Sequence, residues 1–247
     1  MAAGEHPETG AARAPAEAAD RVRDAASVIA IRRDGPEPRI LMGQRGRSAA
    51  FMPSKFVFPG GAVDATDAEV AEAFPPPAGL AAQLARRPGP GIGPEIGPML
   101  ALAAVRELWE ETGLALAARA GAPGAEAAAQ APSWASFFAA GHRPACEGFD
   151  FVFRAVTPPG RPRRFDARFL TVDAALLAGD PEDFSGADQE LAHLSWITLA
   201  EARRLDLPFI TEVVLAELEA RLAGPPRAPA PVPFFHHDGG QSFIDPL

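Results

Sequence analysis

The segment 102–113 limits what this chain can fold into more than any other part of its sequence. Its acids are spaced i, i+3 and i+4, so a helix would carry them on one face; they are Glu107, Glu110 and Glu111. Its apolar residues fall on the opposite face; they are Leu102, Val105 and Trp109. Gly113 then suits the end of the helix.

A helix held against a core by such an apolar stripe presents its carboxylates rigidly. Carboxylate oxygens are the ligands that hard divalent cations prefer. Acids at this spacing more commonly form a solvated helix face. That alternative interpretation stays open until the rest of the chain is considered.

The composition narrows the class of protein. A chain of 247 residues suits one large domain, or one domain with a substantial insertion. Without an apolar run of membrane-spanning length or a secretory signal, we expect a cytoplasmic protein with no membrane partner. The single cysteine, Cys146, excludes an internal disulfide and fits a reducing compartment. The net charge of −9 argues against nucleic acid as a partner.

Local patterns predict alternating strands and helices. The predicted strands are 27–31, 39–44, a short one ending at 59, 149–156, 164–172 and 193–197. The predicted helices are 62–74, 80–86, 133–140, one that starts near 199 after a Thr198 cap, and 211–222. We expect a disordered tail over 1–20, a globular domain over 25–222, and a Pro-rich linker with a tail over 223–247. Interleaved elements of this kind predict a mixed sheet between helical layers.

A Pro-Gly-Gly sequence precedes the acidic helix by about forty residues. A short strand ends at Pro59, and the paired glycines Gly60 and Gly61 let the backbone turn sharply or approach a ligand closely. A plain turn would be the better interpretation if the downstream glutamates were absent.

These two segments together resemble the Nudix box, G-x5-E-x7-R-E-U-x-E-E-x-G-U with U aliphatic. The matching residues of the second half are Arg106, Glu107, Leu108, Glu110, Glu111, Gly113 and Leu114. The resemblance implies an α/β fold, the Nudix α/β/α sandwich with a mixed central sheet. It also implies a pyrophosphohydrolase that cleaves a nucleoside diphosphate linked to another moiety X, with Mg²⁺ or Mn²⁺ as the cofactor.

The chain departs from the box in its spacing. The box leaves about thirteen residues between its first Gly and its Arg, and this chain has several times that number between Gly61 and Arg106. We therefore expect an insertion over 62–98, of which 75–98 is an exposed loop around a short helix. No residue of it is assigned to the early Glu of the box, and Asp64 is the nearest candidate. An insertion beside an active site often shapes substrate access.

The resemblance also assigns roles to residues. The metal ligands would be Glu107, Glu110, Glu111 and the carbonyl of Gly60; the catalytic group would be Glu110, Glu111, Glu190 and Arg106. Arg106 would orient a glutamate through an ion pair. Glu190 is the candidate for an acid outside the box, as ligand or general base, with Asp188 as its substitute. A plain surface acid is an equally good interpretation of Glu190.

The closest branch of the family by this resemblance is the coenzyme A and acyl-coenzyme A diphosphatases of mitochondrial and peroxisomal type. A signature of some members, L-L-T-x-R-S-x-x-L-R-x3-G-x3-F-P-G-G, is matched here at Leu41, Met42, Arg45 and 58–61. Ala50 and Ser54 stand where its second Arg and its Gly belong. The match is therefore partial.

The expected substrate contacts follow from this partial match. They are Arg45 and Arg47 for a 3′-phosphate, Gly61 for close backbone approach, and Arg168, which shares a strand face with Arg164. Solvated arginines are the alternative for that strand. NADH, ADP-ribose or nucleotide sugars stay open as substrates, as does a nucleotide-binding module without turnover, although the intact glutamates disfavour the module. The partner is a small-molecule nucleotide diphosphate, and monomer and homodimer both stay open.

Overall fold

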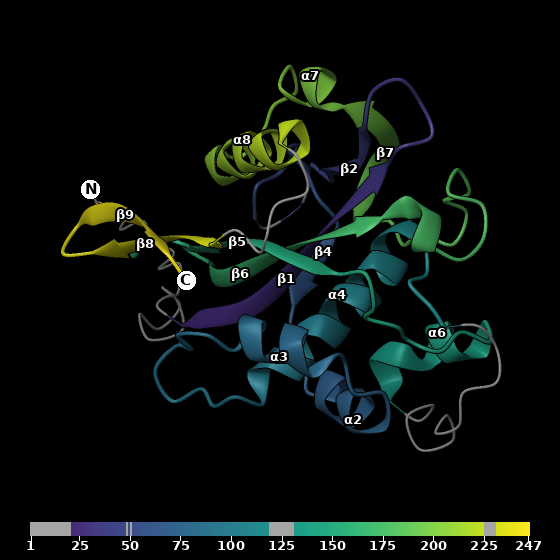
Figure 1. The fold of residues 1–247 in the computed structure, drawn as a ribbon, viewed down its shortest axis with the longest axis horizontal. Helices are drawn as coiled ribbons and strands as arrows, with labels where there is room; N and C mark the ends of the chain where they lie inside the picture. Colours follow the sequence, from purple (N-terminus) through teal and green to yellow (C-terminus); the bar gives the residue numbers. More distant parts are fainter. Residues whose placement is uncertain (1–20, 48, 50, 119–130, 225–230) are drawn as a thin grey trace, which may run out of the picture.

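The computed structural model describes residues 21–47, 49, 51–118, 131–224 and 231–247, so the expected tail over 1–20 lies outside the described residues. The centre of the fold is one mixed sheet with the strand order β3-β2-β1-β6-β5-β8-β9, while β4 pairs with β1 and β7 with β2 (Figure 1). β1 runs parallel to β6 and β5 parallel to β8, whereas the other pairs are antiparallel. The strands are β1 (Val22–Arg32), β2 (Arg39–Arg45), β3 (Phe56–Val57), β4 (Gly60–Ala62), β5 (Asp150–Val156), β6 (Arg164–Asp173), β7 (Leu191–Thr198), β8 (Pro233–Asp238) and β9 (Gln241–Pro246).

Helices cover both faces of this sheet. They are α2 (Thr66–Ala73), α3 (Ala78–Leu84), α4 (Ile96–Thr112), α6 (Ala135–Ala139), α7 (Leu199–Ala202) and α8 (Phe209–Ala223), with 3₁₀ turns η1 (Pro132–Trp134) and η2 (Ala174–Leu176). Figure 1 shows α8 on one side of the sheet and α4 with α3 and α2 on the other. Adjacent residues of β1 serve the two layers: Val28 packs in the core on the α4 side and Ile29 in the core on the α8 side. The predicted α/β/α sandwich is confirmed.

The insertion is more ordered than the sequence suggested. Its second part, expected to be an exposed loop around a short helix, instead packs α3 against α4 and buries Leu80 and Leu84. The contact is close, because a Cβ at Gly97 of α4 would lie 2.1 Å from the carbonyl oxygen of Ala81. The turn after α3 is bonded to the sheet by Arg154, which donates to two of its backbone carbonyls at 2.8 and 2.9 Å.

The expectation of a linker and tail over 223–247 is wrong for the last part of the chain. β8 and β9 form a hairpin that extends the central sheet, with Phe234 opposite Arg154 in the parallel β5–β8 pair. Phe234 is buried and joins the core on the α4 side. Within the hairpin, His236 of β8 contacts Asp245 of β9 at 2.7 Å. The prolines around this short hairpin obscured its strand pattern.

The helices of the described residues include none with the length and apolarity needed to span a membrane.

Candidate active site

The C-terminal half of α4 presents the three box glutamates beside β4. The helix ends as predicted at Gly113, which adopts φ 75° and donates its N–H to the Trp109 carbonyl at 2.8 Å. A Cβ at Gly113 would also lie 3.0 Å from Gly186 of the loop before β7. Glycine therefore serves twice here, as a left-handed cap and as the point where that loop reaches the helix.

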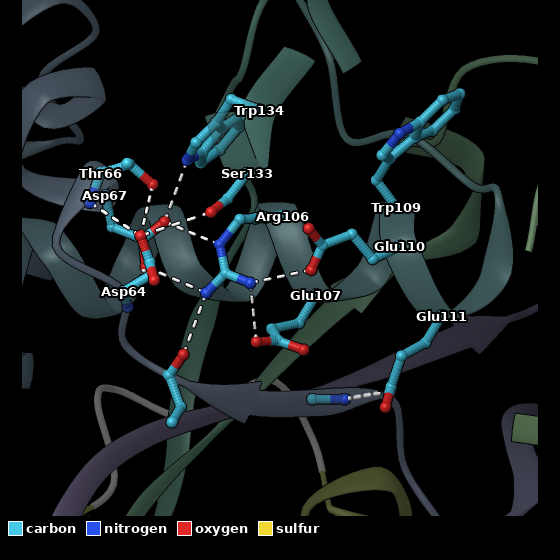
Figure 2. A network of polar contacts seen from close by, with 12 residues as sticks. Asp64, Thr66, Asp67, Arg106, Glu107, Trp109, Glu110, Glu111, Ser133 and Trp134 are labelled. Atoms are coloured by element: carbon cyan, nitrogen blue, oxygen red, sulfur yellow. Dashed lines mark hydrogen bonds and ion pairs between the residues drawn. The ribbon is translucent and has the colours of Figure 1, made fainter. Parts of the chain in front are cut away.

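Arg106 is the centre of a buried polar network (Figure 2). Its Nε and Nη2 donate to the two carboxylate oxygens of Asp67 at 2.9 and 3.1 Å. Its Nη1 donates at 2.8 Å to one oxygen each of Glu107 and Glu110. A further bond from Nη2 reaches the Ala62 carbonyl of β4 at 3.0 Å. Burial alone lowers the pKa of Arg106, but the Asp67 hydrogen bonds and the neighbouring carboxylates raise it well above its usual value, so the guanidinium stays charged.

Asp67 is the residue that sequence reasoning missed. It lies six residues after Gly61, which is the G-x5-E spacing of the box, with Asp in place of Glu. The choice of Asp64 as the nearest candidate was wrong, because Asp64 accepts hydrogen bonds from Thr66 at the start of α2 and makes no ion pair with Arg106. The extra residues of the box therefore lie between Asp67 and Arg106. The spacing from Gly61 was enough to identify Asp67. It was overlooked because Arg106 lies much further along the chain than the box spacing requires.

The two glycines of β4 let the chain approach its neighbours closely. A Cβ at Gly61 would lie 2.5 Å from the carboxylate of Glu107. Gly60 has φ 153°, and a Cβ there would lie 2.4 Å from the Ala26 carbonyl of β1. The Gly60 N–H donates to Glu111 at 2.7 Å, so this glycine holds a box carboxylate directly. The Pro-Gly-Gly segment is thus more than a turn.

The three box glutamates crowd negative charge into a buried space. Burial raises the pKa of Glu107 to about 7, against the pull of Arg106. Burial likewise raises the pKa of Glu110, and burial together with the charge of Glu107 raises that of Glu111 well above its usual value. One guanidinium does not compensate these carboxylates, so a further cation would stabilise them in their ionised form.

This donor set fits a hard divalent cation. Carboxylates beside a close backbone turn are suited to Mg²⁺ or Mn²⁺, which commonly retain water ligands. In the described part of the chain, no three His, Cys, Asp or Glu side chains are already gathered closely enough to enclose an ion. The fit therefore rests on the chemistry and uncompensated charge of the donors rather than on a preformed cage.

The loop before β7 brings further acids to the end of α4. The Asp188 N–H donates to the Glu110 carbonyl at 2.7 Å, and the Glu190 N–H donates to the Asp188 side chain at 2.8 Å. The charge of Asp188 contributes to the raised pKa of Glu110, and that of Glu190 contributes at Glu111. The structure thus brings both predicted outside acids to the box glutamates.

The predicted substrate residues divide into two groups. Arg45 of β2 lies at the site and donates to Glu190 at 2.6 Å, while Arg47 is exposed. Gly61 lies directly beside Glu107. Arg168, in contrast, is 0 % exposed.

The expected substrate contact of Arg168 is contradicted by this burial. Its Nη1 donates to Asp24 at 2.5 Å and to the Asp166 carbonyl at 2.9 Å, within the layer between the sheet and the insertion. Burial also lowers the pKa of Arg168. The alternation of side chains along β6 was predicted correctly. The predicted role of Arg168 was wrong because the insertion covers the face on which this side chain lies.

Known proteins resemble the chain in sequence and in fold, although no family model matches it. A Caenorhabditis elegans protein named "Putative nudix hydrolase 7" is 37% identical over 92 residues, which is 37% of this chain and 22% of that protein. The match thus spans about a fifth of the relative's length. The crystal structure of a NUDIX hydrolase from Alicyclobacillus acidocaldarius is similar with a TM-score of 0.59 and 27% identity, covering 85% of this chain and 99% of that one.

Both likenesses agree with the geometry of the site. The sandwich fold positions α4 and β4 as the two halves of one box, and the box residues meet around Arg106. In its box and in its fold, this chain is thus similar to Nudix hydrolases.

Proposed function

We propose that this protein is a metal-dependent hydrolase that cleaves the diphosphate bond of a nucleoside diphosphate linked to a moiety X. One observation carries the proposal: the three box glutamates, all with raised pKa values, share the end of α4 beside β4, and the one guanidinium there, that of Arg106, pairs with only Glu107 and Glu110. A diphosphate is itself polyanionic, so it enters such a pocket only when cations neutralise both sides.

Glu107, Glu110, Glu111 and the carbonyl of Gly60 are the proposed holders of Mg²⁺ or Mn²⁺. A bound ion supplies charge neutralisation at the phosphoryl oxygens and lowers the pKa of water. Arg106 donates a hydrogen bond to one carboxylate oxygen each of Glu107 and Glu110, so the other oxygen of each remains for the metal ion. The Gly60 N–H does the same for Glu111.

Glu190 is the proposed general base, with Asp188 as the substitute. Glu190 is half-exposed and can reach a substrate-side water, whereas the backbone N–H of Asp188 is fixed to α4. The Arg45 side chain, now paired with Glu190, would turn toward a substrate phosphate as the substrate enters. Glu190 would take a proton from the attacking water, whose oxygen would form a new bond to one phosphorus while the bridging P–O bond breaks and the other phosphate half leaves.

Coenzyme A or an acyl-coenzyme A is the proposed substrate, supported by the partial signature around Arg45 and Phe58–Gly61. The exposed Arg47 is the proposed second contact for the 3′-phosphate. The alternatives are NADH, ADP-ribose and nucleotide sugars, which present the same diphosphate. With a net charge of −9, the chain is better suited to a small nucleotide than to a nucleic acid.

The test is a panel of diphosphate compounds incubated with the protein and Mg²⁺ or Mn²⁺, with products identified by mass. The expected result is a nucleoside monophosphate half and a phosphopantetheine half from coenzyme A, with no turnover in EDTA. Efficient cleavage of ADP-ribose or NADH with coenzyme A left intact would remove the coenzyme A assignment and keep the chemistry. No metal-dependent cleavage of any compound would remove the hydrolase itself.

The role of Arg45 is tested by Arg45→Ala against Arg39→Ala, since both residues lie on β2 and Arg39 stands at the other end of the strand. We expect Arg45→Ala to raise KM for the substrate about tenfold, the effect of losing one charge-assisted phosphate contact. Arg39→Ala should leave KM within about twofold of the wild-type value. Equal KM values for the two variants would remove Arg45 from the substrate site.

A further inference from the structure

A tryptophan from outside the box reaches the buried end of the Arg106 network. Trp134 belongs to η1, more than twenty residues after α4, and its side chain is 0 % exposed. Its indole N–H donates to Asp67 at 3.0 Å. Figure 2 shows the indole N–H pointing at the Asp67 carboxylate, toward which the Arg106 guanidinium also points.

Asp67 depends on this contact because it lies fully inside the protein. One of its oxygens accepts from Arg106 Nε and from Trp134, and the other accepts from Arg106 Nη2 and from the Asp64 N–H at 2.8 Å. Among the described residues, the donors to Asp67 other than Arg106 are therefore Trp134 and the turn before α2. A buried carboxylate that loses one of these donors carries the full desolvation cost of the missing bond.

The length of the insertion explains why Asp67 needs a contact from outside the box to fix its position. The quoted box separates its early Glu from its Arg by seven residues, whereas thirty-eight residues separate Asp67 from Arg106. The ends of a longer loop are less restricted by the chain between them. Contacts through space must then fix Asp67, and Trp134 is itself held by the rings of Phe137 and Phe138, with centroids 5.4 and 5.9 Å away.

We propose that Trp134 is a positioning residue for the metal carboxylates. It holds Asp67, Asp67 orients the guanidinium of Arg106, and Arg106 in turn fixes one oxygen of Glu107 and one of Glu110. The inference rests on the proposed function, because it gives those glutamates the role of metal ligands.

Trp109 supplies a matched control within the same aromatic cluster. Its ring lies 5.7 Å from that of Phe137, and its indole N–H donates to Ser136 at 3.0 Å rather than to the Arg106 network. Figure 2 shows its side chain directed away from Arg106. Replacing either tryptophan with Phe removes an indole N–H and some packing, but only the change at Trp134 removes a donor to Asp67.

The experiment measures Mn²⁺ binding by electron paramagnetic resonance for the full-length wild type, Trp134→Phe and Trp109→Phe. We expect Trp134→Phe to bind Mn²⁺ about three- to tenfold more weakly, below the loss typical of residues that contact a ligand directly. Trp109→Phe should stay within about twofold of the wild type. Wild-type affinity in Trp134→Phe, or equal weakening in both variants, would overturn the inference. A wild-type protein that binds no Mn²⁺ would instead overturn the proposed function.

A double-mutant cycle with Asp67→Ala tests whether Trp134 acts through Asp67. If it does, Trp134→Phe has almost no further effect on Mn²⁺ affinity once Asp67 is replaced. Two independent losses that multiply would show a general packing effect and would overturn the inference.

A measurement on the unsubstituted protein covers the case in which Trp134→Phe does not fold. The indole N–H signal of Trp134 in a ¹H–¹⁵N spectrum should shift during titration with diamagnetic Mg²⁺. The signal of Trp196, whose N–H donates to the Pro181 carbonyl at 2.8 Å, serves as the internal reference. A Trp134 signal that moves no more than that of Trp196 at saturating Mg²⁺ would overturn the inference.

Discussion

Two buried arginine networks lie on the α4 side of the sheet, and their charge balance separates them. Around Arg106, the carboxylates of Asp67, Glu107 and Glu110 share one guanidinium. Beneath the insertion, two guanidinium groups face two carboxylates; the members are Arg154, Arg168, Asp24 and Asp166. The first network has negative charge in excess and the second is balanced.

Charge balance thus separates a candidate reactive site from a buried ion-pair network that only stabilises the fold. The balanced network pairs its charges internally, although Nε and Nη2 of Arg168 are buried without a hydrogen-bond partner. Its Arg154 also donates to the backbone carbonyls after α3, which fastens the insertion to the sheet. An unbalanced network raises the pKa values of its own carboxylates until another cation arrives. If excess charge indicates chemistry and balance indicates stability, substitutions in the first network should change activity and metal binding, and those in the second should change the free energy of unfolding.

The largest effect is expected for Glu110→Gln in the unbalanced network. Loss of one proposed metal carboxylate should lower kcat/KM on the order of 10³-fold, with little loss of folding stability because charge crowding is relieved. Steady-state kinetics with Mg²⁺ or Mn²⁺ and a thermal melt measure the two quantities. Full metal-dependent activity in this variant would end the metal role of Glu110.

The opposite outcome is expected for Arg154→Leu in the balanced network. Removing this partner leaves Asp166 buried without its bidentate ion pair, which should lower the free energy of unfolding by about 3 kcal/mol. Mn²⁺ affinity of the folded fraction should be unchanged. Arg203→Leu is the control, because Arg203 makes an exposed ion pair with Glu219 that should be worth less than about 1 kcal/mol. Similar denaturation midpoints for the two variants would refute the supporting role.

The metal-free protein should lose stability as pH rises from about 4.5 to about 7. Over this range the folded protein keeps a proton on Glu107, whose pKa is raised to about 7, while the unfolded chain has released it. Because the unfolded state then binds fewer protons, the free energy of unfolding falls with pH, by roughly 2 kcal/mol. Thermal melts in EDTA at pH 5 and pH 7.5 measure the change, and Glu107→Gln should reduce it. A melting temperature that rises over this range would contradict the prediction.

The smallest effect is expected for Gly61→Ala. The added Cβ meets the carboxylate end of Glu107, a flexible group that can turn aside, so the fold should tolerate it. The displaced carboxylate should weaken Mn²⁺ binding about tenfold. Gly79→Ala in α3 is the control, since a Cβ there meets nothing within 4 Å. Unchanged Mn²⁺ affinity in Gly61→Ala would show that Glu107 is not a ligand.

Local patterns predicted most of the secondary structure. The strand over 164–172 appears as β6, and the cap at Thr198 appears with Glu201 as a full capping box. These features depend on neighbours in sequence, which is why they were readable. Helix α3 was recognised, but its burial was not, because burial depends on what packs against it.

Asp67 and Arg168 show why the site was only partly predictable. Asp67 stands in the correct register from Gly61, but its partner Arg106 lies beyond the insertion, and only the folded chain brings the two together. Arg168 alternates correctly along β6, but alternation gives two faces without saying which one is covered. The insertion covers its face, so the predicted surface arginine lies inside.

The box glutamates, the paired glycines and the sandwich fold could be predicted from the sequence alone, because each depends on residue spacing that a helix or strand converts directly into position. Which charges share Arg106, where Glu190 and Asp188 lie, and which arginines are buried became evident only in the folded chain. Those outcomes depend on contacts between residues far apart in the chain, such as Asp67 with Trp134, and on the dielectric surroundings that packing creates.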